Sequence, residues 1–329
     1  DGVIAVNASV LERMLKVLGP VEAKDMLLEK SNALEQLQYE IEVGYDKKTE
    51  KPKEVLAEVL NQMMASMSEL KTADIMSLST ELHEALQQKE IQIYMDDEKV
   101  ENQLRLFGWT GEILPTQDDQ DYLSVYQTNI QGQKSDAKIS QFISHEAVID
   151  EDGNIIDTVI VERAHSGLPG EQFYGGLNIS YVRVYVPEGA ELISAGGFSY
   201  PPEDAFRVPE NWYEDDVQLK ETEKEESVDL ETGTRITREF GKTAFGNWVI
   251  TEPGKTSTVY FRYKLPFKAQ FSEVPAGNLS RWQNIFVPAL NKQTSRYSLL
   301  IQKQSGLNSN FSSTIIYPSN WLPAWKSNE

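Results

Sequence analysis

The sequence contains no cysteine, and this absence removes several kinds of chemistry. Without thiols there can be no disulfide cross-link, no zinc–thiolate site and no cysteine nucleophile. No apolar run approaches the roughly 20 residues that cross a bilayer as a helix. No signal peptide is visible, and the first residue is Asp1 rather than Met. We therefore expect a processed or excised piece of a longer protein, with any membrane anchor upstream of Asp1.

Positive charge is also scarce. The 329 residues include 31 Lys and Arg against 51 Asp and Glu, which gives a net charge of −20. Binding to nucleic acid or to an anionic membrane surface depends on Lys and Arg, so the composition argues against both as partners. The acidity leaves a cation such as calcium possible. The length suits two domains, and a hydrophobic content of 40% is compatible with a packed interior.

Helical periodicity dominates the first part of the chain. Apolar residues recur every three to four positions in five segments, 9–18, 31–43, 52–70, 72–86 and 96–107. Short apolar runs at 1–7 and 91–94 predict strands. The order strand, helices, strand, helix predicts an α/β portion over 1–132, which we expect to be incomplete at its N-terminus.

From Ile139 onward the apolar residues alternate instead. Two runs rich in β-branched residues flank Asp-Glu-Asp-Gly-Asn at 150–154, and Asp-Gly between such runs is a strong hairpin signal. About nine strands with turns between them predict an antiparallel β-sandwich of immunoglobulin-like type over 133–329. Polar excursions at 201–231 and 268–294 interrupt it. The predicted fold class is therefore α+β with two domains.

One candidate metal site lies in the central hairpin. Asp150, Asp152 and Asn154 stand at alternate positions and Asp157 follows, a spacing at which calcium loops supply oxygen ligands. In a helix–loop–helix calcium site, however, glycine occupies the sixth position, whereas Gly153 is fourth and the loop joins two strands. We therefore favour an acidic hairpin turn over a calcium site. A group at Asp118, Asp119 and Asp121 repeats the pattern less completely.

No catalytic constellation emerges from the other residues. His145 and His165 fall on opposite arms of the predicted hairpin and could be near one another, but no third ligand is evident, and His83 is placed on a helix. The sequence has no G-x-S-x-G motif and no glycine-rich phosphate loop before a helix. We predict no catalytic residue and no cofactor other than a possible calcium ion, and a non-enzyme is favoured while an enzyme stays open.

Aromatic residues in the two excursions allow two interpretations. Trp212, Tyr213 and Trp282 could stack on sugar rings, or they could pack against the sheet. Tryptophan is seldom left in solvent, so packing is favoured.

Three stretches together resemble a known family. They are DGVIAVNASVLERMLKVLGPVE, EALQQKEIQIYMDDEKVENQLRLFGWTGEI, and the late pair GNWVITEPGKTSTVYFRYKLP and YSLLIQKQSG. Their order and spacing resemble a bacterial cell-envelope family of unknown function, domain-of-unknown-function family four-thousand-and-twelve. The resemblance implies a location on the extracellular face of a bacterial envelope and an N-terminal anchor.

The front part is also similar to the back half of a LytR–CpsA–Psr domain. Those domains transfer glycopolymers from a lipid pyrophosphate to peptidoglycan, and one of their helices carries phosphate-binding Arg. The matching stretch here, NALEQLQYE at 32–40, has no Lys or Arg and two Glu. Carboxylates repel a pyrophosphate, so the resemblance implies a shared scaffold without the shared chemistry.

These observations lead to one leading hypothesis and two alternatives. The leading hypothesis is a non-catalytic bacterial cell-envelope or surface protein with a structural, adhesive or glycan-binding role, whose partner is a cell-wall glycan or another surface protein. The first alternative is a fragment of a LytR–CpsA–Psr-like glycopolymer phosphotransferase. The second is a self-assembling surface-layer or filament subunit that associates through the edge strands of its sandwich.

Overall fold

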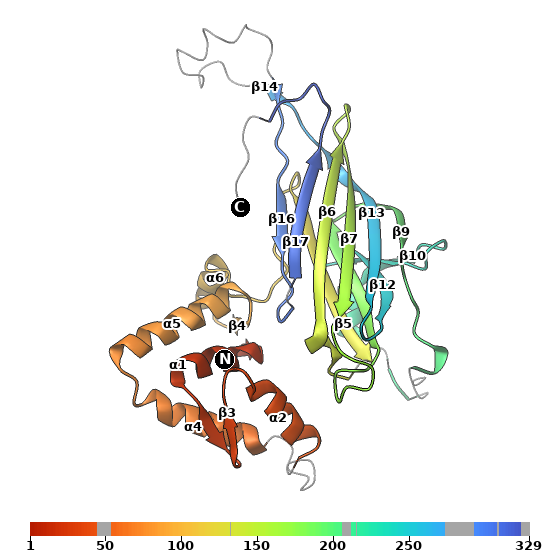
Figure 1. Cartoon of the computed structure of the whole chain (residues 1–329). Coiled ribbons are helices and arrows are strands. Elements are labelled where there is room, and N and C mark those ends of the chain that lie inside the picture. Colours follow the sequence, from red (N-terminus) through yellow and green to blue (C-terminus); the bar gives the residue numbers. More distant parts are fainter. Residues whose placement is uncertain are drawn as a thin grey trace, which may run out of the picture. The chain divides into compact units, whose positions relative to one another are not determined.

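The structure is a computed structural model that describes residues 1–44, 54–131, 133–205, 212–214, 216–273, 293–307 and 309–323. The chain forms two compact units, Asp1–Glu112 and Ile113–Glu329. Figure 1 shows helices gathered in the first unit and long strands in the second. Among the described residues, strands make up 39% and helices 25%, so the predicted α+β class is confirmed.

The first unit packs helices around two small antiparallel sheets. β1 (Gly2–Val6) pairs with β4 (Ile91–Met95), and β2 (Val21–Ala23) pairs with β3 (Met26–Leu28). The helices are α1 (Ser9–Leu18), α2 (Ala33–Glu42), α4 (Glu54–Met67), α5 (Thr72–Gln87) and α6 (Glu98–Leu106). The apolar sides of α1, α2 and α4 bury one core, which includes Leu15, Leu37 and Val59.

These helices are short compared with the thickness of a membrane. α5, for example, has 16 residues, whereas a spanning helix needs roughly 20 apolar ones. Within the described ranges, no helix combines the length and the apolarity needed to cross a bilayer.

One sheet of the second unit has six strands, in the order β10-β11-β12-β8-β5-β16. They are β5 (Asp121–Gln131), β8 (Asn178–Pro187), β10 (Lys224–Val228), β11 (Arg235–Glu239), β12 (Lys242–Thr251) and β16 (Leu299–Gln302). The pairs β10–β11, β11–β12, β12–β8 and β8–β5 are antiparallel. The edge strand β16 is parallel to β5.

The other sheet has five strands, in the order β17-β6-β7-β13-β9. They are β6 (Ile139–Ile149), β7 (Asn154–His165), β9 (Glu191–Gly196), β13 (Thr256–Lys268) and β17 (Ser309–Ile316). β6 and β7 form the predicted hairpin, closed where Ile149 faces Ile155. The edge strand β17 is parallel to β6.

The two parallel pairs depart from the antiparallel arrangement predicted over 133–329. Alternation of apolar and polar residues indicates which side chains face the core, but it is the same for a strand that runs in either direction. β16 and β17 come last in the chain, and each joins one edge of a sheet. Alternation in the sequence therefore could not predict their direction.

The two large sheets share one hydrophobic core. Val184 and Phe245 of the six-stranded sheet belong to the same buried cluster as Val159 and Phe261 of the five-stranded sheet. The rings of Phe245 and Phe261 are stacked with their centroids 6.4 Å apart. In β6, residues at alternate positions are buried, which is the pattern of a strand with one face toward a core.

The second unit begins earlier than the predicted boundary between 132 and 133. β5 lies before that boundary, yet it pairs with β8 inside the six-stranded sheet. Local sequence patterns do not show which sheet a strand will join. The boundary in the structure therefore falls after Glu112.

The two predicted excursions, 201–231 and 268–294, are described to different extents in the structure. Within 201–231, the structure places the turn η2 (Glu203–Ala205), the helix α7 (Val217–Thr222) and the strand β10, which joins the six-stranded sheet. Only the ends of the second excursion, 268–294, are described; there β14 (Ser272–Glu273) pairs with β15 (Gln293–Thr294). Trp282 lies outside the described residues. A short turn, η1 (Ser135–Lys138), precedes β6.

Candidate metal centre

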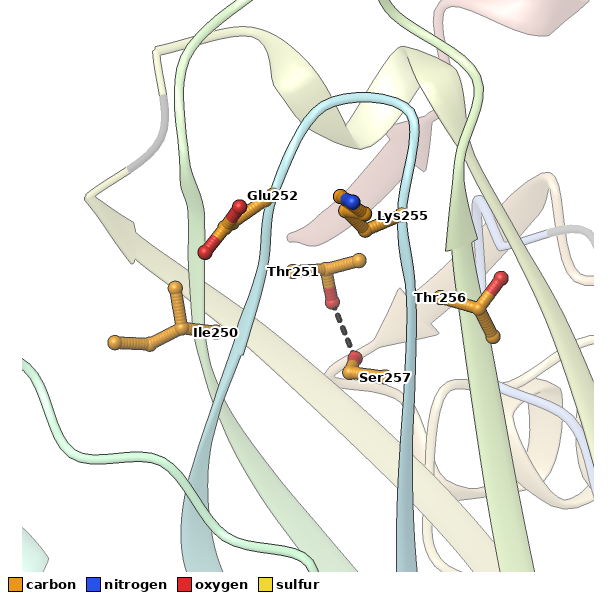
Figure 2. A pocket seen from close by; sticks show the side chains of 6 residues that line it. All are labelled: Ile250, Thr251, Glu252, Lys255, Thr256 and Ser257. Carbon is orange, nitrogen blue, oxygen red and sulfur yellow. Dashed lines mark hydrogen bonds between the residues drawn. The ribbon is translucent and has the colours of Figure 1, made fainter.

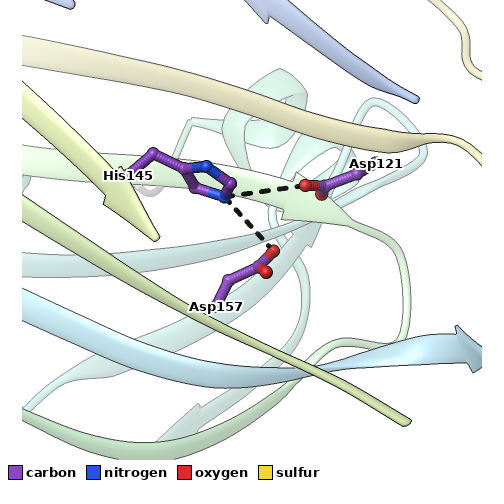
Figure 3. A group of neighbouring side chains, drawn as sticks. All are labelled: Asp121, His145 and Asp157. Atoms are coloured by element: carbon purple, nitrogen blue, oxygen red, sulfur yellow. Dashed lines mark ion pairs between the residues drawn. The ribbon is translucent and has the colours of Figure 1, made fainter. Parts of the chain in front are cut away.

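Three titratable side chains from separate strands meet inside the second unit (Figure 3). Asp121 is the first residue of β5, His145 lies in β6, and Asp157 lies in β7. One nitrogen or oxygen atom of each lies within 4.8 Å of the others. No part of the three side chains is exposed to solvent. The group can hold one metal ion, with ligands drawn from both large sheets.

The strand register explains why His145 and Asp157 approach each other. Ala147 pairs with Asp157, and His145 pairs with Val159. His145 and Asp157 are therefore diagonal neighbours on one face of the β6–β7 hairpin, a separation that long side chains can bridge. That face is the buried one, because both residues occupy buried positions of alternating strands.

The imidazole of His145 points at both carboxylates. Its Nε2 atom lies 3.7 Å from Asp121 Oδ2 and 3.6 Å from Asp157 Oδ2, while its Nδ1 atom lies 3.0 Å from Ser313 Oγ of β17. No atom of the described chain forms a hydrogen bond with Nε2. Burial lowers the pKa of His145, although the charge of Asp121 opposes this. Burial thus favours the neutral ring, which is the form that binds metals.

The Asp121 carboxylate is held in place by its neighbours. Its Oδ2 atom accepts a hydrogen bond of 2.5 Å from the Tyr297 hydroxyl, and its Oδ1 atom accepts one of 2.7 Å from the backbone N–H of Tyr122. Burial, together with the nearby charge of Asp157, raises the pKa of Asp121 well above its usual value. Ionisation of both carboxyl groups is therefore disfavoured unless a cation lies between them.

Asp157 is less well accommodated. Burial raises its pKa to about 7, although the neighbouring Asp121 and Tyr263 side chains oppose the rise. Neither carboxylate oxygen has a hydrogen bond of good geometry in the described part of the chain, and the same holds for the buried Tyr263 hydroxyl. Buried polar atoms without partners are uncommon and costly, so this group needs an explanation.

A second buried acid shows what a complete network looks like. Glu239 of β11 accepts hydrogen bonds from Thr237 Oγ1 at 2.5 Å, from the Tyr185 hydroxyl at 2.6 Å and from Arg183 Nη1 at 3.2 Å. Arg183 provides the compensating positive charge. Glu239 is therefore satisfied by the protein alone, whereas Asp157 is not.

The structure separates the four residues predicted as a possible calcium site. Asp150 Oδ1 accepts hydrogen bonds from the backbone N–H groups of Asp152 at 3.0 Å and Asn154 at 2.8 Å, and Asp150 Oδ2 accepts one from Asn154 Nδ2 at 2.8 Å. The hydrogen bond from the Asn154 side chain is the largest cause of the lowered pKa of Asp150. Gly153 has the positive φ of 78° that this turn requires. These three residues form a hairpin turn, whereas Asp157 lies in the buried cluster.

His165 and His83 also lie apart from His145. His165 pairs in register with Ile139, away from His145, and its Nε2 atom lies 3.1 Å from the carbonyl oxygen of Gly176. His83 lies on α5 in the first unit. Sequence reasoning missed the grouping of Asp121 with His145 and Asp157. The sequence signal that could have revealed this group was the presence of titratable residues, His145 and Asp157, at inward positions of two alternating strands.

A surface pocket lies at the turn between β12 and β13 (Figure 2). Its lining residues are Ile250, Thr251, Glu252, Lys255, Thr256 and Ser257. The hydroxyls of Thr251 and Ser257 lie 2.6 Å apart. Thr256 pairs with Ala164, so the pocket is beside the C-terminal end of β7, remote from Asp157.

Comparisons with protein-family models, curated proteins and solved structures give no match to this chain. Its function must therefore be argued from the residues and their geometry.

Proposed function

We propose that this is a non-catalytic protein of a bacterial cell envelope and that its second unit binds cell-wall glycan. In this proposal the protein acts on the extracellular face, and the second unit is a β-sandwich. The shared core of the two large sheets supports the sandwich. The acidic composition, with a net charge of −20, fits a partner that is neither nucleic acid nor an anionic membrane surface.

The observation that carries glycan binding is a pair of exposed aromatic residues. Trp212 is 68% exposed and Tyr213 is 62% exposed. Their rings stack on each other with centroids 4.2 Å apart. Exposed apolar groups beside polar ones mark interaction sites, and an aromatic ring combines an apolar face with a polar edge. The adjacent Glu214 is also exposed and can accept hydrogen bonds from sugar hydroxyls.

The burial of the Asp121–His145–Asp157 group supports a non-catalytic role. Catalysis requires contact between the reacting groups and the substrate. These three side chains are fully enclosed between strands, so a polymer such as a glycan does not reach them in this conformation.

The test is co-sedimentation of the full chain with purified bacterial cell walls. We expect Trp212→Ala and Tyr213→Ala each to weaken binding by about 2–13-fold, since one aromatic contact contributes about 0.5–1.5 kcal/mol. Tyr39→Ala is the matched control, because Tyr39 is also an exposed aromatic but lies on α2 of the first unit. The proposal fails if the wild-type chain does not sediment with the walls or if all three variants bind alike.

The edge strand β17 favours a second candidate function, self-assembly. The strand has the sequence SNFSSTII without a charged residue, and every position from Asn310 to Ile316 is exposed. Edge strands of soluble proteins usually carry charges, prolines or bulges that prevent pairing with another chain. An uncharged apolar edge can add a strand from a second copy.

Sedimentation at increasing protein concentration distinguishes this candidate. We expect Ile316→Lys to reduce association, because a charge on the edge opposes strand pairing. Ile193→Lys is the control on β9, the opposite edge of the same sheet. Loss of association in both variants would indicate a β17-to-β9 chain of copies, and a wild-type monomer at high concentration contradicts self-assembly.

A further inference from the structure

Polar atoms without partners converge on one point inside the second unit. They are Nε2 of His145 and both carboxylate oxygens of Asp157; in the described structure none of them makes a hydrogen bond. Figure 3 shows the His145 ring directed between the carboxylates of Asp121 and Asp157. When the imidazole is neutral with its proton on Nδ1, facing Ser313 Oγ, each of these atoms presents a lone pair, so they repel one another unless a positive charge lies between them.

A shared proton explains only part of this arrangement. One proton between Asp121 and Asp157 would remove the repulsion between two carboxylates. It would leave His145 Nε2 at 3.6 and 3.7 Å from the nearest carboxylate oxygens, which is too long for a hydrogen bond. A metal ion, by contrast, engages all three side chains at once.

We propose that Asp121, His145 and Asp157 bind one divalent metal ion of the zinc class and that this ion links the two large sheets of the second unit. Asp121 belongs to the six-stranded sheet, and the other two ligands belong to the five-stranded sheet. The ion therefore acts as a cross-link inside a core that has no disulfide. This role is separate from the glycan binding proposed above and does not depend on it.

The separations between the donor atoms fit zinc. Ligands about 2.0–2.2 Å from a tetrahedral zinc ion lie about 3.3–3.6 Å from each other. In the structure, His145 Nε2 lies 3.7 Å from Asp121 Oδ2 and 3.6 Å from Asp157 Oδ2. Small movements of side chains are enough to close the remaining difference.

The donor types favour zinc over calcium. Calcium takes six to eight oxygen ligands, whereas one of the three donors here is an imidazole nitrogen. Imidazole suits zinc and the late transition metals, and carboxylate oxygens complete such sites. The absence of cysteine means that a zinc site in this chain must be built from nitrogen and oxygen donors.

Neighbouring groups orient the proposed ligands. With the Nδ1–H of His145 donated to Ser313 Oγ, the lone pair of Nε2 is directed at the cluster. Tyr297 and the backbone N–H of Tyr122 hold Asp121. Tyr263 pairs in register with Asp157, and its hydroxyl can donate to whichever carboxylate oxygen does not bind the ion. Such outer contacts are typical of metal sites.

The experiment begins with the full chain stripped of metal by a chelator and dialysed. Zn²⁺, Co²⁺ and Ca²⁺ are then added separately and bound metal is measured by calorimetry and elemental analysis. We expect one equivalent of Zn²⁺ to bind, Co²⁺ to bind with a visible absorption band of low coordination number, and Ca²⁺ not to displace either. The proposal is overturned if neither Zn²⁺ nor Co²⁺ binds stoichiometrically or if only Ca²⁺ does.

Variants assign the binding to this cluster. Asp157→Asn should abolish Zn²⁺ binding, and Ser313→Ala should weaken it by about 10–100-fold through loss of the contact to Nδ1. Ser313 is on an exposed edge strand, so this variant keeps the test valid if Asp157→Asn does not fold. Asp152→Asn is the matched control in the nearby hairpin turn, and it should bind Zn²⁺ like the wild type. Equal loss in Asp152→Asn and Ser313→Ala overturns the assignment.

Discussion

Asp157 and Arg163 lie on the same inward face of β7, and both are fully buried. They are about 20 Å apart along the strand. At Asp157, two further ligand-capable side chains converge on one point. At Arg163, all three guanidinium nitrogens lack a hydrogen-bond partner in the described ranges, and the ion pair to Asp136 is long, at 3.8 Å. Burial lowers the pKa of Arg163 to about 10.

The comparison shows that a buried charge is not by itself a binding site. The neighbours of Arg163 in register are Gln141 and Ser257, and each is already engaged elsewhere: Gln141 with Gln127 at 2.8 Å, and Ser257 with Thr251. The ion pair of Arg163 with Asp136, at 3.8 Å, is longer than the separations of His145 from its two carboxylates. We therefore interpret the acidic end as a ligand site and the Arg163 end as a local cost in stability.

The largest expected effect that tests the comparison of Asp157 with Arg163 is the pH dependence of the free energy of unfolding of the metal-free chain. The pKa of folded Asp157 is about 7, above its ordinary 3.8, so the folded state holds a proton that the unfolded state has lost. Asp157 therefore makes the free energy of unfolding fall as pH rises from about 4 to 7, by at most about 4 kcal/mol in total. Arg163 titrates above this window and contributes nothing within it.

The measurement is urea unfolding of wild type and Asp157→Asn without metal at pH 5 and pH 7. His145, whose pKa is lowered, acts in the opposite direction below its usual pKa, whereas Asp121, whose pKa is raised by burial and by the charge of Asp157, acts in the same direction. The difference between the two proteins therefore reports Asp157 together with its effect on Asp121. A wild-type chain that gains more stability than the variant between pH 5 and 7 would contradict the protonated state of this carboxyl.

Metal loading should have the next largest effect. Zn²⁺ at 100 times its dissociation constant should raise the free energy of unfolding by about 2.7 kcal/mol, because only the folded state presents the three ligands together. Thermal unfolding with and without Zn²⁺ measures this. The shift should vanish in Asp157→Asn and persist in Arg163→Met; a shift in both variants would place the metal elsewhere.

Replacing Arg163 should change the free energy of unfolding in the opposite direction to replacing Arg183, which forms an ion pair with Glu239. Arg163→Met should raise the free energy of unfolding by about 1 kcal/mol or more, since it removes a desolvated charge and keeps the length of the side chain. Arg183→Met should lower it by about 1–3 kcal/mol, because Glu239 then stays buried without its cation. Denaturant unfolding measures both, and a destabilised Arg163→Met would reveal a partner for the guanidinium.

The smallest effect should come from the turn that joins β6 and β7. Asp152→Asn should change the free energy of unfolding by less than about 0.5 kcal/mol, because its exposed side chain makes no contact that the turn needs. The same unfolding experiment, with and without Ca²⁺, checks this. Stabilisation of the wild type alone by Ca²⁺ would restore the calcium interpretation of the turn.

Local patterns in the sequence anticipated much of the architecture. The Asp-Gly turn and the β-branched runs beside it predicted the β6–β7 hairpin, because turn chemistry and alternation act between near neighbours. The period of the apolar residues separated the helical first part from the sheets for the same reason. The packing predicted for Trp212 and Tyr213 was wrong, since both are exposed.

By itself, the sequence determined the local structure, the α+β class and the limits set by composition, above all the lack of thiol ligands. Tertiary structure alone decided that Asp121 meets His145 and Asp157, and that Asp157 lies in this buried cluster rather than in the hairpin turn. It also decided that β16 and β17 run parallel to their neighbours. The physical reason is the distance along the sequence over which each effect acts. Alternation assigns a side chain to a face, but only the assembly of distant strands into sheets brings particular faces and residues together.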